Sequence, residues 1–426
     1  MSQPSGQQAR KIVVGVAGGI AAYKACHVVR DLKEHGDDVR VVPTESALNF
    51  VGAATFEALS GHPVATTVFD AVDQVQHVRV GQEADAIVIA PATADLIARL
   101  AIGRADDLLT ATVLVATCPV IVVPAMHTEM WYNAATRENV STLRRRGITV
   151  MEPAHGRLTG RDTGPGRLPD PEQIAELTRT VLDDQPIPHD WAGRKVLISA
   201  GGTQENIDPV RYIGNRSSGR QGYALAEIAA QRGAQVTLVV GNVVELPTPA
   251  GAEIVRVVST AEMAEEMARR APEMDVVIMA AAVADFRPDQ VAGAKMKKGS
   301  RDETGLQTLH LVENPDILRT LVEARAAGEV PADTVIVGFA AETGDDTHSA
   351  LDYATAKLAR KGCDLLMCNE VGVGKVFGEK RNRGWLLART ADEDSPGVTE
   401  VVDGSKAVVA AQILRGVADL LTGDGR

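Results

Sequence analysis

The sequence contains the same opening twice, an apolar run that leads directly into a pair of glycines. KIVVGVAGG begins at Lys11 and KVLISAGG begins at Lys195. Each opening is followed by a helical stretch and then by a second apolar run, 39–42 in the first half and 235–240 in the second. Strands that alternate with helices at this spacing form parallel sheets with helices on both faces. We therefore expect an α/β protein with two Rossmann-like domains, each built on a mainly parallel sheet.

A polar segment that contains two prolines separates the two halves. Residues 183–193 read DDQPIPHDWAG, a composition typical of linkers. The chain has 426 residues, a length that favours two or three domains over one. The sequence predicts a first domain over 1–184, a linker over 185–193 and a second domain over 194–426.

Apolar runs and amphipathic periodicity predict the remaining elements. In the first half we expect strands at 86–90 and 120–123, helices at 20–35, 93–101 and 108–116, and a glycine-rich loop at 154–168. In the second half we expect strands at 276–279, 335–337 and 365–368, and helices at 223–232 and 405–421.

The composition limits the possible partners. The formal net charge of −12 argues against nucleic acid, and the 3% aromatic content leaves few platforms for base stacking. The four cysteines form no C-x-x-C pair, which suggests neither a disulfide framework nor a zinc site. No apolar run reaches the roughly 20 residues of a transmembrane helix, and the polar first residues do not resemble a signal peptide. We expect a cytoplasmic protein with no membrane partner.

An NAD(P) site is the obvious alternative for such a fold. Its fingerprint requires G-x-G-x-x-G and an acid at the end of the second strand. The first half has Gly15, Gly18 and Gly19, which is a different spacing, and its second strand ends without an acid. The second half has Gly201 and Gly202, and again no acid follows its second strand. Both halves therefore disfavour NAD(P).

Three loops in the first half carry residues suited to a phosphate. A glycine turn opens the first helix, two hydroxyl residues follow the second strand, and APATADL follows the third. Loops of this kind converge at the carboxyl ends of parallel strands. The candidate cofactor-binding residues are Gly18, Gly19, Ile20, Ala21, Thr44, Ser46, Ala92, Thr93, Ala94 and Asp95.

Together these loops resemble the flavin-containing cysteine decarboxylases, homo-oligomeric proteins with a flavodoxin-like fold in which such loops hold FMN. The resemblance extends to His77 in VQHVRV, which corresponds to the active-site histidine of the family. PAMHTEMW at 124–131 matches the substrate motif PxMNxxMW and makes Met126 a candidate substrate contact. GRLTGRDTGPGRL at 156–168 matches the mobile flap that closes over the substrate.

The chain departs from this family at two positions. His127 stands where the family has asparagine, and Gly160 stands where the flap has a cysteine. The resemblance implies that FMN oxidises the cysteinyl thiol of the substrate, that carbon dioxide leaves, and that the flap cysteine helps to protonate the enethiol. Without that cysteine another acid must act, and His127, Thr159 and Asp162 are candidates. His127 is one hypothesis because the pKa of an imidazole lies near neutrality.

The second half contains AGGTQENIDPVRYIGNRSSG at 200–219, a polar insertion longer than a plain dinucleotide turn requires. Ser217, Ser218 and Gly219 precede a helix, whose first N–H groups can bind an anion. The segment resembles phosphopantothenate–cysteine ligases, and the resemblance continues through AAAVADF, KMKK, ENPDIL and GFAAET. These motifs occupy residues 280–286, 295–298, 313–318 and 338–343.

This second resemblance implies a role for each motif. Asp285 is the candidate ligand of Mg²⁺, a hard cation that takes oxygen ligands. Lys295, Lys297 and Lys298 are expected to form a cationic flap in which one lysine is essential. Asn215 is expected to bind the acyl-cytidylate and, with Asp208 and Arg211, to face phosphopantothenate. The other candidate substrate contacts are Ser217, Ser218, Gly219, Ala280, Ala281, Ala282, Phe286, Asn314, Pro315, Asp316, Phe339, Lys357 and Lys361.

Nearly the whole chain thus resembles the bifunctional enzymes of coenzyme A synthesis that combine both activities. The resemblance implies CTP-dependent ligation of 4′-phosphopantothenate to L-cysteine, followed by FMN-dependent decarboxylation of the product. It also implies trimeric flavin domains and dimeric ligase domains, commonly assembled as a dodecamer. Two alternatives stay open. The first is a flavin domain that is impaired or regulatory, which the missing flap cysteine favours. The second is an NAD(P) oxidoreductase, which the glycine spacing opposes.

Overall fold

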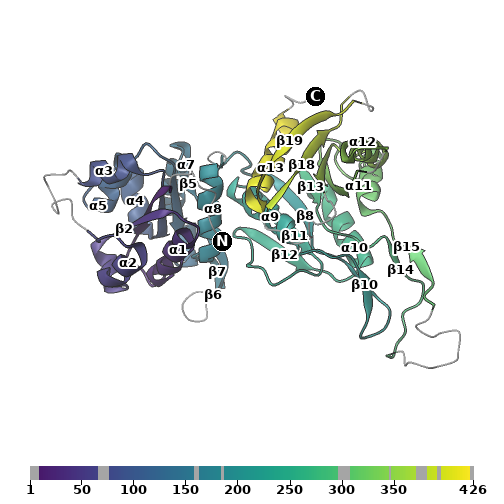
Figure 1. The fold of residues 1–426 in the computed structure, drawn as a ribbon, viewed down its shortest axis with the longest axis horizontal. Coiled ribbons are helices and arrows are strands. Elements are labelled where there is room, and N and C mark those ends of the chain that lie inside the picture. The colour runs from purple at the N-terminus through teal and green to yellow at the C-terminus, as the bar shows by residue number, and fades with distance from the viewer. Residues whose placement is uncertain are drawn as a thin grey trace. The chain divides into compact units, whose positions relative to one another are not determined.

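The computed structural model of the chain describes residues 9–65, 76–157, 163–183, 187–295, 308–344, 347–370, 381–390 and 395–422. The chain divides into two compact units, residues 1–189 and 190–426 (Figure 1). Both units consist of a mainly parallel sheet and helices, so the predicted α/β class is confirmed. Among the described residues, no helix is long and apolar enough to cross a membrane.

The first unit is built on a five-stranded parallel sheet with the strand order β2-β1-β3-β4-β5. This is the order of flavodoxin-like folds, in which ligands bind at the carboxyl ends of β1 and β3, where the order reverses. The elements of the sheet layer and its helices are β1 Lys11–Val16, α1 Ala22–Glu34, β2 Asp38–Pro43, η1 Glu45–Asn49, α2 Ala53–Ser60, α3 Gln76–Glu83, β3 Ala86–Ala92, α4 Ala94–Ile102, α5 Leu108–Leu114, β4 Val120–Pro124, α6 Thr128–Tyr132, α7 Ala134–Arg145, β5 Thr149–Val150 and α8 Pro171–Asp183.

The central strand of this unit explains why the helices pack on both sides. All seven residues of β3 are buried, a pattern typical of parallel strands covered on two faces. Ile87 and Ile89 belong to a core cluster with Leu96 of α4 and Leu109 of α5. Helix α1 packs against α8, and α4 packs against α7.

The predicted glycine-rich loop at 154–168 contains regular structure. Strands β6 Ala154–Arg157 and β7 Thr163–Arg167 pair in an antiparallel hairpin. The tip between them, with the candidates Thr159 and Asp162, lies outside the described residues.

The second unit has an eight-stranded sheet with the order β12-β11-β8-β13-β16-β17-β18-β19. Its first six members are parallel and follow the Rossmann order 3-2-1-4-5-6, whereas β18 and β19 are antiparallel. The elements are β8 Lys195–Ala200, β9 Gln204–Asn206, β10 Tyr212–Gly214, α9 Arg220–Gln231, β11 Gln235–Val240, β12 Ala252–Arg256, α10 Thr260–Arg270, η3 Ala271–Glu273, β13 Val276–Met279, β14 Phe286–Pro288, β15 Leu311–Glu313, α11 Ile317–Ala326, β16 Val335–Glu342, α12 Ala350–Lys361, β17 Leu365–Glu370, β18 Arg381–Ala388, β19 Gly397–Ser405 and α13 Lys406–Thr422.

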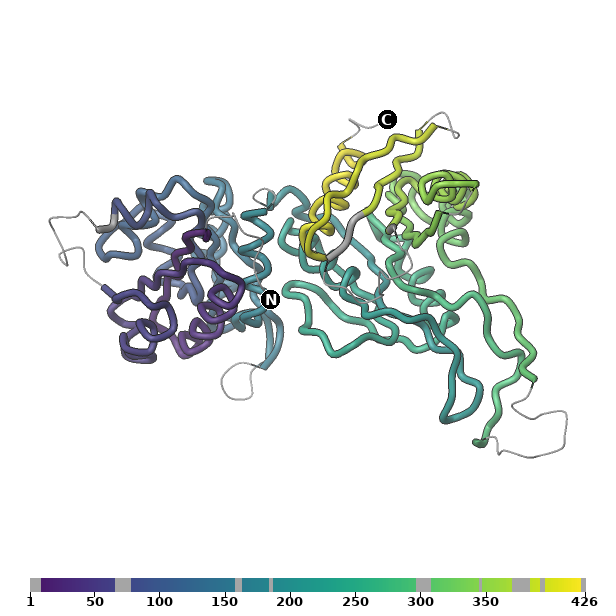
Figure 2. Tube along the Cα trace, viewed as in Figure 1, coloured from purple at the N-terminus to yellow at the C-terminus, as the bar shows by residue number. Residues whose placement is uncertain are grey.

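Two antiparallel pairs lie outside the main sheet of the second unit. The first pair, β9 and β10, forms within the insertion that follows β8, and the second consists of β14 and β15. Strand β14 packs against β9. In the view of Figure 2, both pairs extend toward the lower right of the second unit. The insertion at 200–219 is therefore an ordered hairpin, and α9 begins at Arg220, three residues earlier than the sequence predicts.

The start of the second unit is fixed by a clamp of Asp190, Trp191 and Arg232. The Arg232 guanidinium lies 4.4 Å from the centre of the Trp191 ring and forms an ion pair with Asp190. It also donates a hydrogen bond of 2.7 Å to the carbonyl of Leu414 in α13. Trp191 is buried. The last residues of the predicted linker thus pack onto the second unit.

Candidate functional site

In the first unit, the loops after β1 and β2 touch each other at Gly18. A Cβ atom at this position would lie 2.6 Å from Cβ of Ser46 and 2.8 Å from its carbonyl carbon. The Thr44 hydroxyl accepts a hydrogen bond from the N–H of Ala47 and lies 3.1 Å from Oγ of Ser46. Only glycine fits at position 18 without displacing the second loop.

The third predicted loop joins the other two. A Cβ atom at Gly19 would meet Cγ2 of Thr93 at 3.7 Å, so the turn after β1 lies next to the loop after β3. The Thr93 hydroxyl caps α4 by accepting a hydrogen bond from the N–H of Leu96. The neighbouring candidates differ in exposure: Ile20 is exposed, Ala92 is buried, and Ala21 and Ala94 are intermediate. The three loops that the sequence predicts to converge therefore do so.

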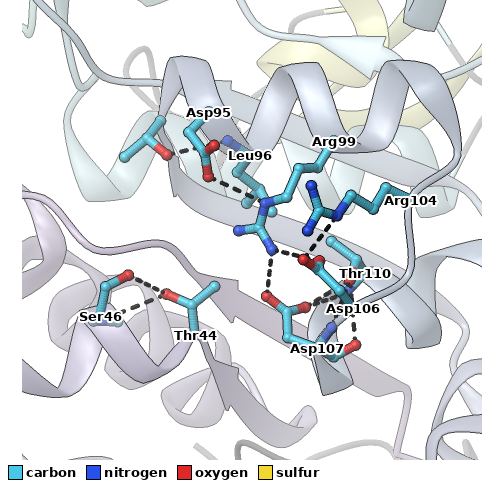
Figure 3. Close-up of polar contacts among 11 residues, drawn as sticks. Thr44, Ser46, Asp95, Leu96, Arg99, Arg104, Asp106, Asp107 and Thr110 are labelled. Atoms are coloured by element: carbon cyan, nitrogen blue, oxygen red, sulfur yellow. Dashed lines mark hydrogen bonds and ion pairs between the residues drawn. The ribbon is translucent and has the colours of Figure 1, made fainter.

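Asp95 is held by an arginine beside this loop (Figure 3). Arg99 lies 3.1 Å from Asp95, 3.0 Å from Asp106 and 2.7 Å from Asp107. The hydrogen bond from Arg99 lowers the pKa of Asp106. Asp107 in turn caps α5 through a capping box with Thr110. The Asp95 carboxylate is thus paired with a cation, which reduces its repulsion of a bound phosphate.

The segment Met126–Thr128 lies against the β6–β7 hairpin. The N–H of Met126 donates to the carbonyl of Gly166 at 2.9 Å, and the Thr128 hydroxyl donates to the carbonyl of Pro165 at 2.8 Å. His127, the N-cap of α6, is exposed between these two anchors. The structure therefore brings the PxMNxxMW-like motif to the base of the glycine-rich hairpin. His77 belongs to α3, and its side chain is outside the described part of the chain.

In the second unit, α9 begins unusually close to β8. A Cβ atom at Gly222 would lie 2.5 Å from Cβ of Ala200, so only glycine allows this approach. Ser217 and Ser218 directly precede the helix, and the N–H of Gly219 donates to Oγ of Ser217 at 3.3 Å. The free N–H groups at the start of α9 therefore lie at the carboxyl end of β8, where an anion can bind.

The loop after β13, residues 280–285, is held along its whole length. The N–H of Ala281 donates a hydrogen bond to Oγ of Ser199, and the N–H of Ala282 donates to the carbonyl of Gly201. The Asn215 side chain donates to the carbonyl of Val283 at 2.8 Å, which leaves its Oδ1 atom as the part able to accept a further hydrogen bond. This loop is a rigid surface beside the α9 N-terminus.

These parts enclose a cavity of about 1290 Å³ at the carboxyl ends of β8 and β13, the point where the strand order reverses. We call it the switch-point cavity. Of the predicted substrate contacts, those that line it are Asn215, Ser217, Ser218, Gly219, Ala280, Ala281, Ala282, Asp285, Phe286, Asn314, Pro315, Asp316, Phe339, Lys357 and Lys361.

Both candidate lysines of α12 are engaged in ion pairs at the cavity. Lys357 lies 2.9 Å from Glu342, and Lys361 contacts Asp316. The other oxygen of Asp316 caps α11 by accepting from the N–H of Arg319. The lysines are thus positioned by carboxylates and available to an anion of higher charge that enters the cavity.

Three of the predicted residues that the structure describes, Asp208, Arg211 and Lys295, are not brought to the cavity. Asp208 is buried, accepts hydrogen bonds from the N–H groups of Val210 and Arg211, and lies 3.6 Å from the Arg211 guanidinium. Lys295 is exposed at the end of a segment that follows β14. None of these three lines the switch-point cavity. Lys297 and Lys298 lie outside the described residues.

The cavity also contains residues that the sequence reasoning missed. Arg360 and Lys406 add positive charge, and Gln204, Thr203 and Asn369 add polar groups. Glu342 does not itself line the cavity but pairs with Lys357, and its place as the last residue of β16, at the carboxyl end of a parallel strand, could have identified it.

Comparison with known proteins agrees with the division of the chain into two units. Residues 1–183 match the Flavoprotein family, and residues 191–421 match the DNA/pantothenate metabolism flavoprotein C-terminal domain. The chain is 57% identical over 415 residues to the coenzyme A biosynthesis bifunctional protein CoaBC of Mycobacterium tuberculosis, covering 97% of each chain. It is 41% identical over 415 residues to the CoaBC of Vibrio vulnificus, covering 97% of this chain and 98% of the relative.

Two solved structures are similar to part of this chain. The C-terminal domain of a CoaBC protein is 33% identical, covers 55% of this chain and 98% of its own, and gives a TM-score of 0.42. The FMN-dependent cysteine decarboxylase SpaF is 34% identical, covers 39% of this chain and 98% of its own, and gives a TM-score of 0.34. From the full-length matches and the two domain families, the chain belongs to the CoaBC family of bifunctional coenzyme A biosynthesis enzymes.

Proposed function

We propose that the second unit joins 4′-phosphopantothenate to L-cysteine at the expense of CTP, and that the first unit decarboxylates the product to 4′-phosphopantetheine with FMN. The observation that carries this proposal is the switch-point cavity, which combines a helix N-terminus, lysines and a rigid loop in one space. A cavity of about 1290 Å³ has room for a nucleoside triphosphate beside a second substrate.

The charges in the cavity support a triphosphate. The N–H groups at the start of α9 and the ammonium groups of Lys357 and Lys361 can neutralise phosphate oxygens. The main chain of Ala280–Ala282 and the rings of Phe286 and Phe339 can frame the base. Lys295, with Lys297 and Lys298, completes the proposed phosphate contacts as a closing flap.

Mg²⁺ fits this site as a partner of the nucleotide. It is usually held by one or two carboxylates together with substrate phosphates. Asp285 lines the cavity and is exposed, so one protein carboxylate is available. In the described part of the chain, no group of three His, Cys, Asp or Glu side chains could hold a metal ion without the substrate.

The ligation then proceeds in two steps. The pantothenate carboxylate attacks the α-phosphorus of CTP, the bond to the leaving pyrophosphate breaks, and an acyl-cytidylate forms. The amine of L-cysteine attacks the acyl carbon and displaces CMP, and a proton leaves the amine. Asn215 orients the acyl-cytidylate through its Oδ1 atom, while the cations stabilise the leaving phosphates. Asp208 and Arg211 are proposed to hold the phosphopantothenate end.

The first unit fits FMN at its three converging loops. Gly18 and Gly19 bring the main chain close to the Thr44, Ser46 and Thr93 hydroxyls, which is a cradle of neutral donors for a phosphate. FMN, when bound, supplies the redox chemistry of the decarboxylation. Met126 orients the substrate at the base of the β6–β7 hairpin, and His77 is proposed as the active-site histidine.

The proton donor of the decarboxylase must differ from the family's flap cysteine. His127 is the described candidate, because it is exposed and anchored against the hairpin on both sides. Thr159 and Asp162 remain the alternatives. If His127→Asn retains full conversion to phosphopantetheine, His127 is not the donor.

A product assay tests the proposed function. The purified chain is incubated with 4′-phosphopantothenate, L-cysteine, CTP and Mg²⁺, and the products are identified by mass. Phosphopantetheine with CMP supports both activities. Accumulation of phosphopantothenoylcysteine shows that the flavin unit is impaired or regulatory. The absence of both products contradicts the proposal.

We also propose a cytoplasmic homo-oligomer, a dodecamer of trimeric flavin units and dimeric ligase units. Membership of the CoaBC family supports this assembly. The mass of the native particle, measured by light scattering, tests it, and a monomer would contradict it.

A further inference from the structure

A buried chain of polar groups lies behind the switch-point cavity. Glu205, in the middle of β9, is only 4% exposed, and Thr203 and Thr260 are 1% and 0% exposed. Oε1 of Glu205 accepts from the N–H of Thr260 at 2.9 Å and from its hydroxyl at 2.7 Å. The Thr203 and Thr260 hydroxyls lie 2.9 Å apart, and the N–H of Ala284 donates to Oγ1 of Thr203 at 2.9 Å. We call these four residues the Glu205 relay.

The carboxylate gives this relay a direction. The Thr260 hydroxyl donates its only hydrogen to Oε1 of Glu205. The remaining lone pairs of Thr260 can then only accept, and the Thr203 hydroxyl donates to them. Oγ1 of Thr203 is left as an acceptor for the main-chain N–H of Ala284. Each hydroxyl orientation therefore depends on the next one, and the series ends at Glu205.

The same relay fixes Asn314, which also lines the cavity. The side-chain amide of Asn314 donates to Oγ1 of Thr260 at 3.3 Å and to the carbonyl of Ala284 at 2.9 Å. Its Oδ1 accepts from Arg287 at 3.0 Å. The main-chain N–H of Asn314 also donates to the carbonyl of Asp285 at 2.8 Å. Asn314 therefore links its own loop to the loop at 280–285, because both the nitrogen and the oxygen of its side-chain amide form hydrogen bonds.

Glu205 and Thr260 do not line the cavity, whereas Thr203, Ala284 and Asn314 do. Thr260 is also the first residue of α10, whose N-terminal N–H groups favour a negative partner. Glu205 thus satisfies a helix end and orients the cavity wall with the same oxygen atom. An apolar residue at 205 would leave the buried N–H of Thr260 without an acceptor and would remove the group to which the Thr260 hydroxyl donates.

We propose that Glu205 and Thr260 are positioning residues for nucleotide binding, acting through Thr203 and Asn314 on the loop that frames the cavity. This inference rests on the proposed function, because it assigns the loop at 280–285 to the nucleotide. The two residues touch no substrate. Their effect is to hold the N–H and carbonyl groups of the loop in one arrangement before the nucleotide arrives, so that binding does not have to order them.

The test compares two buried threonines of the second unit in the full chain. Thr260→Val removes the relay hydroxyl, and Thr260→Ser retains it. Thr334→Val is the matched control. Thr334 directly precedes β16, and its hydroxyl is also buried and donates to the carbonyl of Met274 at 2.7 Å. Thr260→Ala replaces the valine variant if that variant folds poorly, since it adds no new contact.

Two measurements are made on each variant. Hydrogen exchange, followed by mass spectrometry, is compared for peptides that contain Ala284. Steady-state kinetics of CMP formation give the KM for CTP and kcat. We expect the amide hydrogen of Ala284 to exchange faster in Thr260→Val than in the parent protein. We also expect this variant to raise the KM for CTP about tenfold while kcat stays within about twofold, which is the effect expected from the loss of the buried hydrogen bonds. Thr260→Ser and Thr334→Val should keep the KM within about twofold of the parent value.

The outcomes separate the inference from the proposed function. If Ala284 exchanges no faster in Thr260→Val than in Thr334→Val, the relay is overturned whatever the kinetics give. If exchange is faster but the KM is unchanged, or if both valine variants raise the KM equally, the positioning role is overturned. If the parent chain forms no CMP, the proposed function fails, and with it the positioning role, while the exchange data still decide whether the relay exists.

Discussion

The contact between Gly18 and Ser46 allows a sharp test of the flavin site. A methyl group at position 18 would lie 2.6 Å from Cβ and 2.8 Å from the carbonyl carbon of Ser46, and neither atom can rotate away. Gly18→Ala must therefore push the loops after β1 and β2 apart. Overpacking of this kind typically costs about 1–3 kcal/mol. Gly19→Ala is the matched control, because its methyl group would meet only Cγ2 of Thr93 at an ordinary 3.7 Å.

Thermal unfolding of the flavin-free protein and titration with FMN measure the effect. Gly18→Ala should lower the Tm of the first unit, whereas Gly19→Ala should leave it unchanged. If the whole cost falls on the arrangement that binds FMN, the Kd of Gly18→Ala rises by about 5- to 150-fold. Equal Tm values and equal Kd values for the two variants would refute the reasoning, because the two loops would then not depend on their contact at Gly18.

Three further predictions concern charged groups. Arg232→Ala should lower the free energy of unfolding of the second unit, measured in urea, by roughly 3 kcal/mol, because the Arg232 side chain is only 5% exposed. Arg194→Ala is the control and should cost under about 1 kcal/mol, because the Arg194 side chain is 43% exposed. Equal losses for the two variants would contradict the clamp. Burial lowers the pKa of His189, so folding stability is lost as the pH falls from about 6.5 through the lower folded value. His189→Gln should flatten the fall in Tm between about pH 7 and pH 5, and an unchanged slope contradicts this assignment. Lys361→Met should raise the KM for CTP most at low salt, and a KM that is unchanged at every salt concentration excludes a phosphate contact.

Strand and helix positions were predictable because the sheets are buried on both faces. Runs such as 86–90 and 335–337 consist of β-branched and small apolar residues, and the structure extends them to Ala86–Ala92 and Val335–Glu342. The convergence of the loops at Gly18, Thr44 and Thr93 also followed from the sequence, because parallel strands end at one edge.

The β9–β10 hairpin could not be predicted in the same way. Each of its strands has three residues, too few for a period of two to emerge, and Glu205 at the centre of β9 is a charged residue in a buried place. Its partner Thr260 begins α10, far along the chain, so only the folded chain reveals why a carboxylate is tolerated there.

The clamp of Asp190, Trp191 and Arg232 also determines where the chain can be divided for protein production. An expression boundary at Arg194 would remove the tryptophan ring and the carboxylate but leave the guanidinium in its buried place against Leu414. In such a fragment the Arg232 guanidinium would be an uncompensated charge beneath the C-terminal helix α13. A fragment that begins at or before Asp190 retains the complete clamp, so a separately produced ligase unit should include these few residues from the predicted linker.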